Sequence, residues 1–176
     1  MDQKQKKFEQ LYGDNRAHLY AYIIRSLRDE NAALDILQDV FLNFFRIFSD
    51  KEFSDDIHAR MYLFKIARNL IINYVNTAYH KKVDISENLD LTKAREVADG
   101  IVEQMNLEES EVKLQILLNK LTEEERTALI LRYQQDMKLE EIAKILDMSV
   151  SSVSRLIKKT TLKVRELGLR QGFSFE

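Results

Sequence analysis

The sequence contains no proline and no cysteine, and only four of its 176 residues are glycine. Turns between β-strands depend on glycine and proline, whereas the abundant Leu, Ile, Lys and Glu residues favour helix. The lack of cysteine excludes disulfide bonds and thiolate chemistry, and it fits a cytoplasmic protein. These absences predict an all-α protein.

Long apolar runs are also missing, although apolar residues make up 45% of the chain. The longest runs are only a few residues, whereas a transmembrane helix needs about 20. Residues 1–4 are polar and lack the apolar stretch of a signal peptide. We therefore expect a folded cytoplasmic protein with no membrane segment of its own.

Signals of enzymatic chemistry are equally scarce. There is no glycine-rich phosphate loop, and the three histidines (His18, His58 and His80) lack metal-ligand spacing. Nothing singles out a catalytic carboxylate pair among the 29 acidic residues. The sequence predicts no enzyme, no metal site and no cofactor.

The net charge of −2 conceals an uneven distribution. Residues 91–112 are strongly acidic, whereas Ser149–Arg170 holds six Lys and Arg residues against one acid. A local basic surface of this kind suits phosphate binding, although a solvated helix face gives the same pattern. Charge alone leaves both interpretations open.

Three amphipathic helices are predicted in the first half of the chain. Flanking helices are expected within residues 8–23 and 61–74, and residues 49–57 read as a polar loop. The clearest apolar repeat lies between them, at steps of three and four residues typical of one buried helix face: Leu34, Leu37, Phe41, Phe44 and Phe48. We expect the three helices to share one core.

The apolar pattern divides the chain into two small helical domains. Residues 1–82 form the first domain, and periodicity weakens across an acidic linker at 83–110. The second domain, 111–176, contains Thr122 and Glu125 at the spacing of a capping box. A new helix is therefore expected to begin directly after Thr122.

The second domain also carries a helix-turn-helix pattern. A short helix is predicted at 139–146, a turn at 147–149, and a longer basic helix capped by Ser149. Ala143 is small where the two helices would cross. The residues left facing outward are candidate DNA contacts: Ser151, Ser152, Ser154, Arg155, Lys158, Lys159 and Lys163. An ordinary helical hairpin with a basic face is the competing interpretation.

Four segments carry a resemblance to a known family. Residues 31–42 (NAALDILQDVFL) resemble the "AEDxxQexFl" segment of sigma-70-type factors, and residues 62–74 (YLFKIARNLIINY) resemble their "WLyxIArNxxxDy" segment. Residues 121–126 (LTEEER) and 139–143 (LEEIA) match two further segments in the family's order and spacing. Together they resemble the two-domain extracytoplasmic function (ECF) sigma factors, which predicts a region 2-like helical bundle and a region 4-like helix-turn-helix domain.

The resemblance implies two partners for the first domain. An acidic face on the second helix would dock on core RNA polymerase through Asp35, Gln38 and Asp39, which are neighbours on a helix surface. The third helix would open the −10 element of promoter DNA, with Asn69 reading an extruded base. Further contacts to this element are expected from Phe64, Lys65, Arg68, Lys81 and Lys82.

The resemblance also implies that the basic helix of the second domain reads the −35 element. Members of the family are often held inactive by an anti-sigma factor, so a similar partner is expected here. The family segments differ from this chain at Tyr62, Asn73 and Asn76, where Trp, Asp and Arg are usual. We therefore expect the general role to be kept and the preferred promoter sequence to differ.

Two other functions remain open at this point. A DNA-binding regulator whose first three helices dimerise or sense a ligand would bind palindromic half-sites without polymerase. A second alternative is an interaction protein that keeps the sigma shape without opening promoters. The polar face of Asp35, Gln38 and Asp39 argues against a dimer interface, which is more apolar at its centre.

Overall fold

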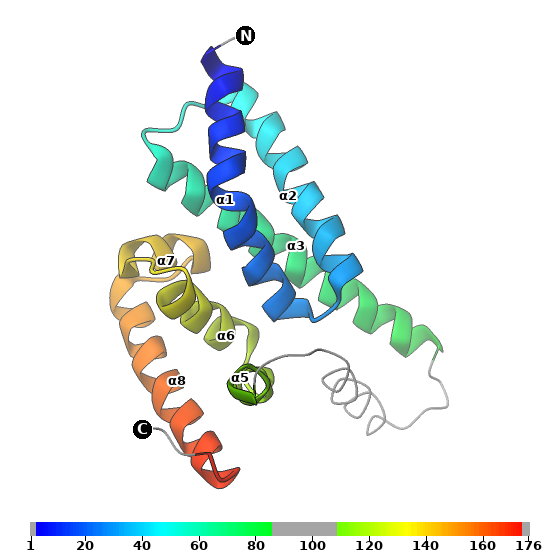
Figure 1. Ribbon diagram of the computed structural model, residues 1–176, viewed down its shortest axis with the longest axis vertical. Coiled ribbons are helices and arrows are strands. Elements are labelled where there is room, and N and C mark those ends of the chain that lie inside the picture. Colours follow the sequence, from blue (N-terminus) through cyan, green and yellow to red (C-terminus); the bar gives the residue numbers. More distant parts are fainter. Residues whose placement is uncertain (1–2, 86–108, 174–176) are drawn as a thin grey trace.

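The computed structural model describes residues 3–85 and 109–173, and within these two ranges the chain is helical and contains no strand. Three long helices form one bundle, and four shorter elements and a long final helix lie beside it (Figure 1). The prediction of an all-α protein is confirmed.

The N-terminal bundle consists of α1 (Gln3–Leu27), α2 (Glu30–Asp50) and α3 (Asp56–Ile85). Asp29 caps α2 by accepting a 2.9 Å hydrogen bond from the backbone N–H of Ala32. Asp55 accepts a 2.7 Å bond from the N–H of His58 at the start of α3. These caps leave residues 51–55 as the connection, which is shorter than the loop predicted at 49–57.

An aromatic cluster packs the end of the bundle where the start of α1 meets the end of α2. Phe44 is fully buried, and its ring lies between those of Phe8, Phe48 and Phe53 at centroid distances of 5.3 to 6.1 Å. The predicted burial of Phe41, Phe44 and Phe48 is confirmed. The prediction for Leu34 is wrong, since 49% of this residue is exposed. The inner face instead continues through Ala33, Ile36 and Val40, so it is rotated slightly from the predicted one.

The second half contains α5 (Glu109–Asn119), α6 (Glu123–Leu129), α7 (Leu139–Leu146) and α8 (Val150–Arg170). A single π-helical turn, η2 (Ile130–Gln134), extends α6. The capping box is confirmed: Thr122 Oγ1 accepts from the N–H of Glu125, and Glu125 accepts from the N–H of Thr122. Helix α6 therefore begins where the sequence predicted.

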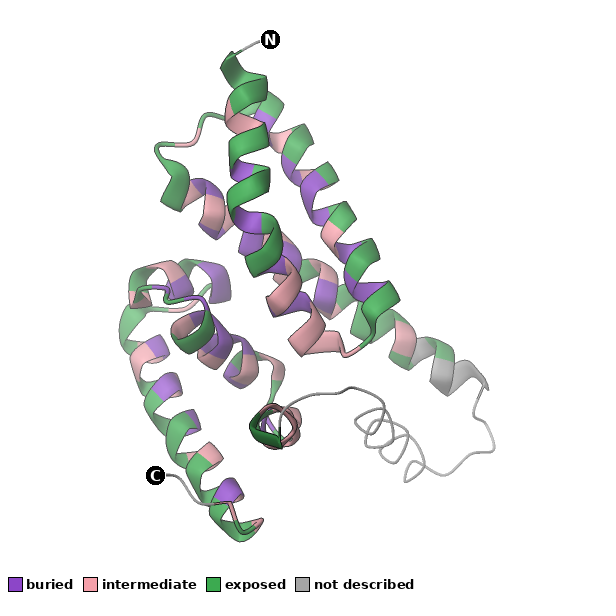
Figure 2. Cartoon of the chain, viewed as in Figure 1, coloured by how far each residue is buried: buried purple, intermediate pink, exposed green. Residues whose placement is uncertain are grey.

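The two halves of the chain pack directly against each other. Both the N-terminal bundle and the second half contain buried residues, as Figure 2 shows. The Tyr22 hydroxyl lies 3.2 Å from Thr127 Oγ1, and burial raises the pKa of Tyr22, so the hydroxyl stays neutral. The backbone carbonyl of Gln135 accepts a 2.8 Å hydrogen bond from Arg60. Polar pairing inside an apolar contact fixes the relative position of α1, α3 and α6.

The predicted domain limits remain a prediction. Helix α3 runs three residues past the expected boundary at 82, and α5 begins two residues before 111. Most of the predicted linker at 83–110 lies outside the described residues.

Candidate functional site

Helices α7 and α8 form the predicted helix-turn-helix. Asp147 ends α7 in the left-handed conformation at φ 54°, and the N–H of Met148 donates to the carbonyl of Ala143 at 2.9 Å. Ser149 caps α8 by accepting from the N–H of Ser152 at 3.2 Å. The apolar sides of both helices are buried at Ala143 and Val153. Local hydrogen bonds thus set the angle between the two helices.

The outer face of α8 presents four of the seven predicted DNA contacts to solvent: Ser151, Arg155, Lys158 and Lys159. Ser152 and Ser154 are half-buried. Ser152 accepts hydrogen bonds from Ser149 at 2.8 Å and from Arg155 at 3.3 Å. The bond from Arg155 holds its guanidinium near the start of the helix, a suitable place for a contact with a guanine edge.

Lys163 differs from the other lysines of α8 because it faces α6. Its ammonium lies 2.7 Å from Glu125 Oε2, the carboxylate that also closes the capping box. Burial opposes ionisation of Glu125, but the hydrogen bonds from Lys163 and from the Thr122 backbone outweigh it and lower the pKa of this carboxyl. Lys163 therefore ties α8 to α6 in this structure, and its contact with DNA stays a prediction.

We expect Glu125→Gln to lower the melting temperature at about pH 7 and to have a smaller effect at about pH 3. The folded pKa of Glu125 is lowered, so its ionised form stabilises the fold above the unfolded pKa of about 4.3. That contribution is lost as the pH falls through the lower folded value. Thermal unfolding followed by circular dichroism tests this, and an equal difference between variant and parent at every pH would contradict it.

The acidic face of α2 is exposed as the sequence predicted. Asp35, Gln38 and Asp39 are all exposed, and within residues 3–85 and 109–173 none makes an ion pair or side-chain hydrogen bond. Three exposed apolar side chains flank this face: Leu34, which was predicted to be buried, and Leu42 and Phe45, which the sequence analysis did not single out; their exposures are 49%, 49% and 53%. Their exposure could have been predicted, because Leu42 and Phe45 fall outside the apolar repeat that marks the buried face of the helix.

These apolar residues border a shallow pocket of about 360 Å³ between α1 and α2. Gln38 is among the residues that line it, and the rings of Tyr12 and Phe41, tilted by 57°, lie 4.5 Å apart between centroids. An exposed apolar patch beside acceptor side chains is typical of a protein-binding surface. The face of α2 is therefore suited to another protein rather than to nucleic acid.

The predicted −10 residues on α3 fall into separate environments. Asn69 and Lys81 are exposed, whereas Lys65 and Arg68 are half-buried against the second half of the chain. The side chain of Lys82 lies outside what the structure describes.

Phe64 is completely buried, with its ring 5.6 Å from that of Tyr22. Because Phe64 faces the core and has no exposed surface, the structure does not support the prediction that it contacts DNA.

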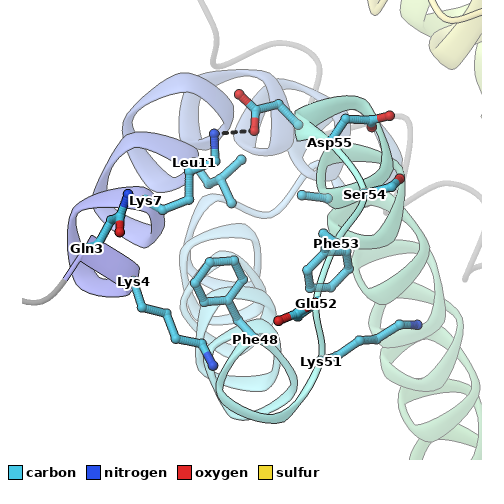
Figure 3. Close-up of a pocket in the computed structure, with 12 residues that line it drawn as sticks. Gln3, Lys4, Lys7, Leu11, Phe48, Lys51, Glu52, Phe53, Ser54 and Asp55 are labelled. Atoms are coloured by element: carbon cyan, nitrogen blue, oxygen red, sulfur yellow. Dashed lines mark ion pairs between the residues drawn. The ribbon is translucent and has the colours of Figure 1, made fainter.

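A hollow of about 550 Å³ lies between the start of α1 and the 51–55 connection (Figure 3). Phe48 and Phe53 line it, and Lys4 and Lys51 stand at its rim. Lys51 also lies over the Tyr62 ring, 4.5 Å from its centroid. The sequence analysis did not single out Lys51, because its position depends on how the connection folds back toward α3.

Other kinds of site find no support within the two described ranges. No group of three or more potential metal ligands comes together there. The described helices also include none with the length and apolar character to cross a bilayer.

The geometry therefore defines a helix-turn-helix with an exposed basic face, joined to a helical bundle with an exposed face of acidic and apolar side chains. Comparison with known protein families agrees with this class. The model of "Sigma-70 region 2" matches residues 11–79, and that of "Sigma-70, region 4" matches residues 117–166.

Comparison with individual proteins identifies the group within the sigma-70 family. The chain is 30% identical over 148 residues to the ECF RNA polymerase sigma factor SigW of Bacillus subtilis, covering 79% of this chain and 76% of SigW. It is 23% identical over 159 residues to SigM of the same organism, another ECF RNA polymerase sigma factor, with coverage of 90% and 93%. The chain belongs to the ECF group of the sigma-70 family: it is a transcription initiation factor and not an enzyme.

A solved structure has the same fold. The sigma factor RpoE of Bartonella quintana, in complex with the anti-sigma factor NepR, superposes with a TM-score of 0.71 at 18% identity. The match covers 92% of this chain and 96% of RpoE. It confirms the two-domain helical architecture predicted from the sequence.

Proposed function

We propose that this sigma factor binds core RNA polymerase through α2, opens the −10 element with α3 and reads the −35 element with α8. In this proposal residues 1–82 act as region 2, 83–110 as the linker and 111–176 as region 4. The observation that carries it is the presence of both sigma regions in one chain, in that order. Each region exposes a surface of suitable chemistry.

Core polymerase is the partner proposed for the face of Asp35, Gln38 and Asp39. These residues lie on adjacent turns of one helix, so a basic partner helix can contact all three. The exposed Leu42 and Phe45 beside them would supply apolar area that a charged face alone lacks. The absence of partners for the three polar side chains within the described parts of the chain leaves them available for docking.

Promoter DNA is the partner proposed for the two reading helices. Asn69 is exposed on α3, and an amide can pair with a base edge as donor and acceptor. Lys65, Arg68 and Lys81 would hold phosphates of the opened strand. On α8, Arg155 and the serines Ser151, Ser152 and Ser154 would contact bases, while Lys158 and Lys159 would bind the backbone.

An anti-sigma factor is the regulator proposed for this chain. The RpoE structure of the same fold was solved with an anti-sigma factor bound. Such a partner would act by covering the surfaces that face polymerase, with the α2 face as the first candidate. Because polymerase and promoter are cytoplasmic, we place the active protein there.

Transcription from a genomic promoter library with purified core polymerase tests the proposal. Adding the chain should yield transcripts that start downstream of a shared two-element sequence, and the free protein should bind duplex DNA only weakly. Transcription no better than with core alone would contradict the proposal. Tight binding of free protein to palindromic duplexes would favour the dimeric regulator instead.

A further inference from the structure

An apolar pocket of about 440 Å³ is lined by residues of α5, α6, η2 and α8 and by the end of α1. Small-molecule sites in proteins are commonly clefts of about 300 to 1,000 Å³ with apolar walls and a few polar groups. The lining combines buried and exposed side chains: Leu118 and Ile130 are buried, whereas 39% of Leu114 and 66% of Tyr133 are exposed. None of the residues proposed above to contact polymerase or DNA lines this pocket.

The walls of the pocket are suited to a hydrocarbon chain. Leu129 and Val164 also line it, so aliphatic side chains from α5, α6, η2 and α8 surround the space. Removing apolar surface from water is the main favourable contribution to binding at a site of this kind. The pocket therefore predicts a ligand with an apolar body.

One charged side chain interrupts the apolar lining. Arg25, in the last turn of α1, is the only charged residue among the described residues that line the pocket. Its Nη2 donates to both carboxylate oxygens of Glu111 at 3.1 Å, which fixes the position of the guanidinium. Its Nη1 is buried and has no hydrogen-bond partner within residues 3–85 and 109–173. An unpaired buried donor is unusual in a native protein and calls for a water molecule or a ligand.

The π-helical turn η2 brings further polar groups to the pocket. Tyr133 and Gln134, two of its five residues, line the pocket and are exposed. The Tyr133 hydroxyl and the Gln134 amide can both donate hydrogen bonds to an oxygen atom. Turns of this type are rare and are frequently found at functional sites.

These donors favour a carboxylate as the head group of the ligand. The described lining residues include no Asp or Glu, so no acidic side chain of the lining would repel it. An ionised carboxylate only accepts hydrogen bonds, whereas an ammonium group only donates them and would face other donors. Because Glu111 already offsets the charge of Arg25, recognition would depend on hydrogen bonds to the head group more than on net charge.

We propose that this pocket binds a small amphipathic carboxylate, such as a medium-chain fatty acid, with its chain among the apolar walls and its head group hydrogen-bonded to Arg25. The site goes beyond the function proposed above, because it involves residues assigned neither to polymerase nor to DNA. Since the pocket exists only in the folded chain, a bound carboxylate also raises the melting temperature.

Three eight-carbon compounds that differ only in the head group test the proposal on the unchanged protein. In isothermal titration calorimetry, octanoate should bind saturably and about tenfold or more tightly than 1-octanol or octylamine, as expected for a hydrogen bond to a charged group. Equal affinities for the three compounds would indicate nonspecific partition onto apolar surface and would overturn the proposal. A lack of saturable octanoate binding up to about 1 mM would do the same.

The length of the ligand chain provides a second measurement. Each buried CH₂ group increases the affinity about fourfold, so octanoate should bind about 15-fold more tightly than hexanoate. An affinity that does not change with chain length would place the ligand outside the apolar walls and would contradict the proposal.

Arg25→Gln tests the head-group contact, with Arg16→Gln as the matched control. Arg16 is exposed on α1 and does not line the pocket, so the control makes the same charge change elsewhere on the helix. Arg25→Gln should bind octanoate about tenfold or more weakly and should bind 1-octanol as the parent does. Arg16→Gln should bind both compounds as the parent does. Parent-like binding of octanoate by Arg25→Gln would show that the proposed contact is wrong, and the head-group series on the parent still decides the proposal if circular dichroism shows this variant to be unfolded.

The chain has no tryptophan, so a single one can report where the ligand binds. Tyr133→Trp places the reporter at an exposed residue of the pocket, and Tyr79→Trp places it at an exposed residue of α3. Octanoate should shift the emission of Tyr133→Trp to shorter wavelength over the concentrations that saturate the calorimetric signal. The emission of Tyr79→Trp should stay unchanged. The same shift in both variants, or a shift in neither, would overturn the assignment of the ligand to this pocket.

Discussion

Core RNA polymerase is expected to bind the Asp39→Arg variant at least about 30-fold more weakly than the parent, because reversing a charge at a docked face leaves its partner unpaired. Truncating one member of a buried, hydrogen-bonded charge pair costs about 2 to 5 kcal/mol, and about 1.4 kcal/mol is a factor of ten. Asp39 is exposed and has no side-chain partner within residues 3–85 and 109–173, so the substitution should leave the fold intact.

Competition between labelled parent and unlabelled variant for a limiting amount of core measures this effect. The matched control is Asp14→Arg, the same charge reversal at an exposed residue of α1. Asp14→Arg should compete as well as the parent, which separates docking at α2 from the general effect of added positive charge. If Asp39→Arg competed for core at the same concentration as the parent, the proposal that α2 contacts polymerase would be wrong.

Promoter opening is expected to fall by about 5- to 150-fold in Asn69→Ala, while core binding stays unchanged. A two-point amide contact to a base edge is worth about 1 to 3 kcal/mol. That energy offsets the few kcal/mol needed to unstack a base, so its loss acts on opening. Asn69 is exposed on α3 and lies outside the aromatic core, so truncating it removes no packing.

Permanganate reactivity of unpaired thymines at a promoter found in the library measures the open state directly. Thr77→Ala is the control, because Thr77 is also exposed on α3 and lies outside the residues assigned to the promoter. It should open the promoter as the parent does. An equal loss of opening and core binding in Asn69→Ala would instead indicate a folding defect, and an equal loss in both variants would remove the base-reading role of Asn69.

Features set by neighbouring residues were predictable from the sequence. The capping box at Thr122 and Glu125, the short helix at 139–146 and the cap at Ser149 all formed as predicted. Each depends on hydrogen bonds within a few residues, so the sequence pattern contains the whole interaction. The resemblance in residues 31–74 added the exposed face of α2, which periodicity alone does not distinguish from any solvated surface.

Features set by contacts between distant segments were not predictable. Arg68 pairs with Glu123, which is 55 residues away, and Lys65 pairs with Asp147, which is 82 residues away. Nothing local in either segment records such a pairing, so both cations appeared available for DNA. The partner of Lys163 was unpredictable for the same reason, since only the packing of α8 on α6 brings it to Glu125. Phe64 was assigned to DNA because it lies near Asn69 in the sequence, whereas its burial depends on how α3 packs against α1.

The ion pair between Lys163 and Glu125 also limits the angular freedom of α8. Lys163 lies 13 residues beyond Val150, the first residue of the helix, so the reading end extends about 20 Å from this anchor. Over that lever arm, a tilt of about 10° shifts the first turn by about 3.4 Å, the rise of one base pair. If Arg155 binds the −35 element as proposed, the carboxylate of Glu125 in α6 would help decide which base pair it meets.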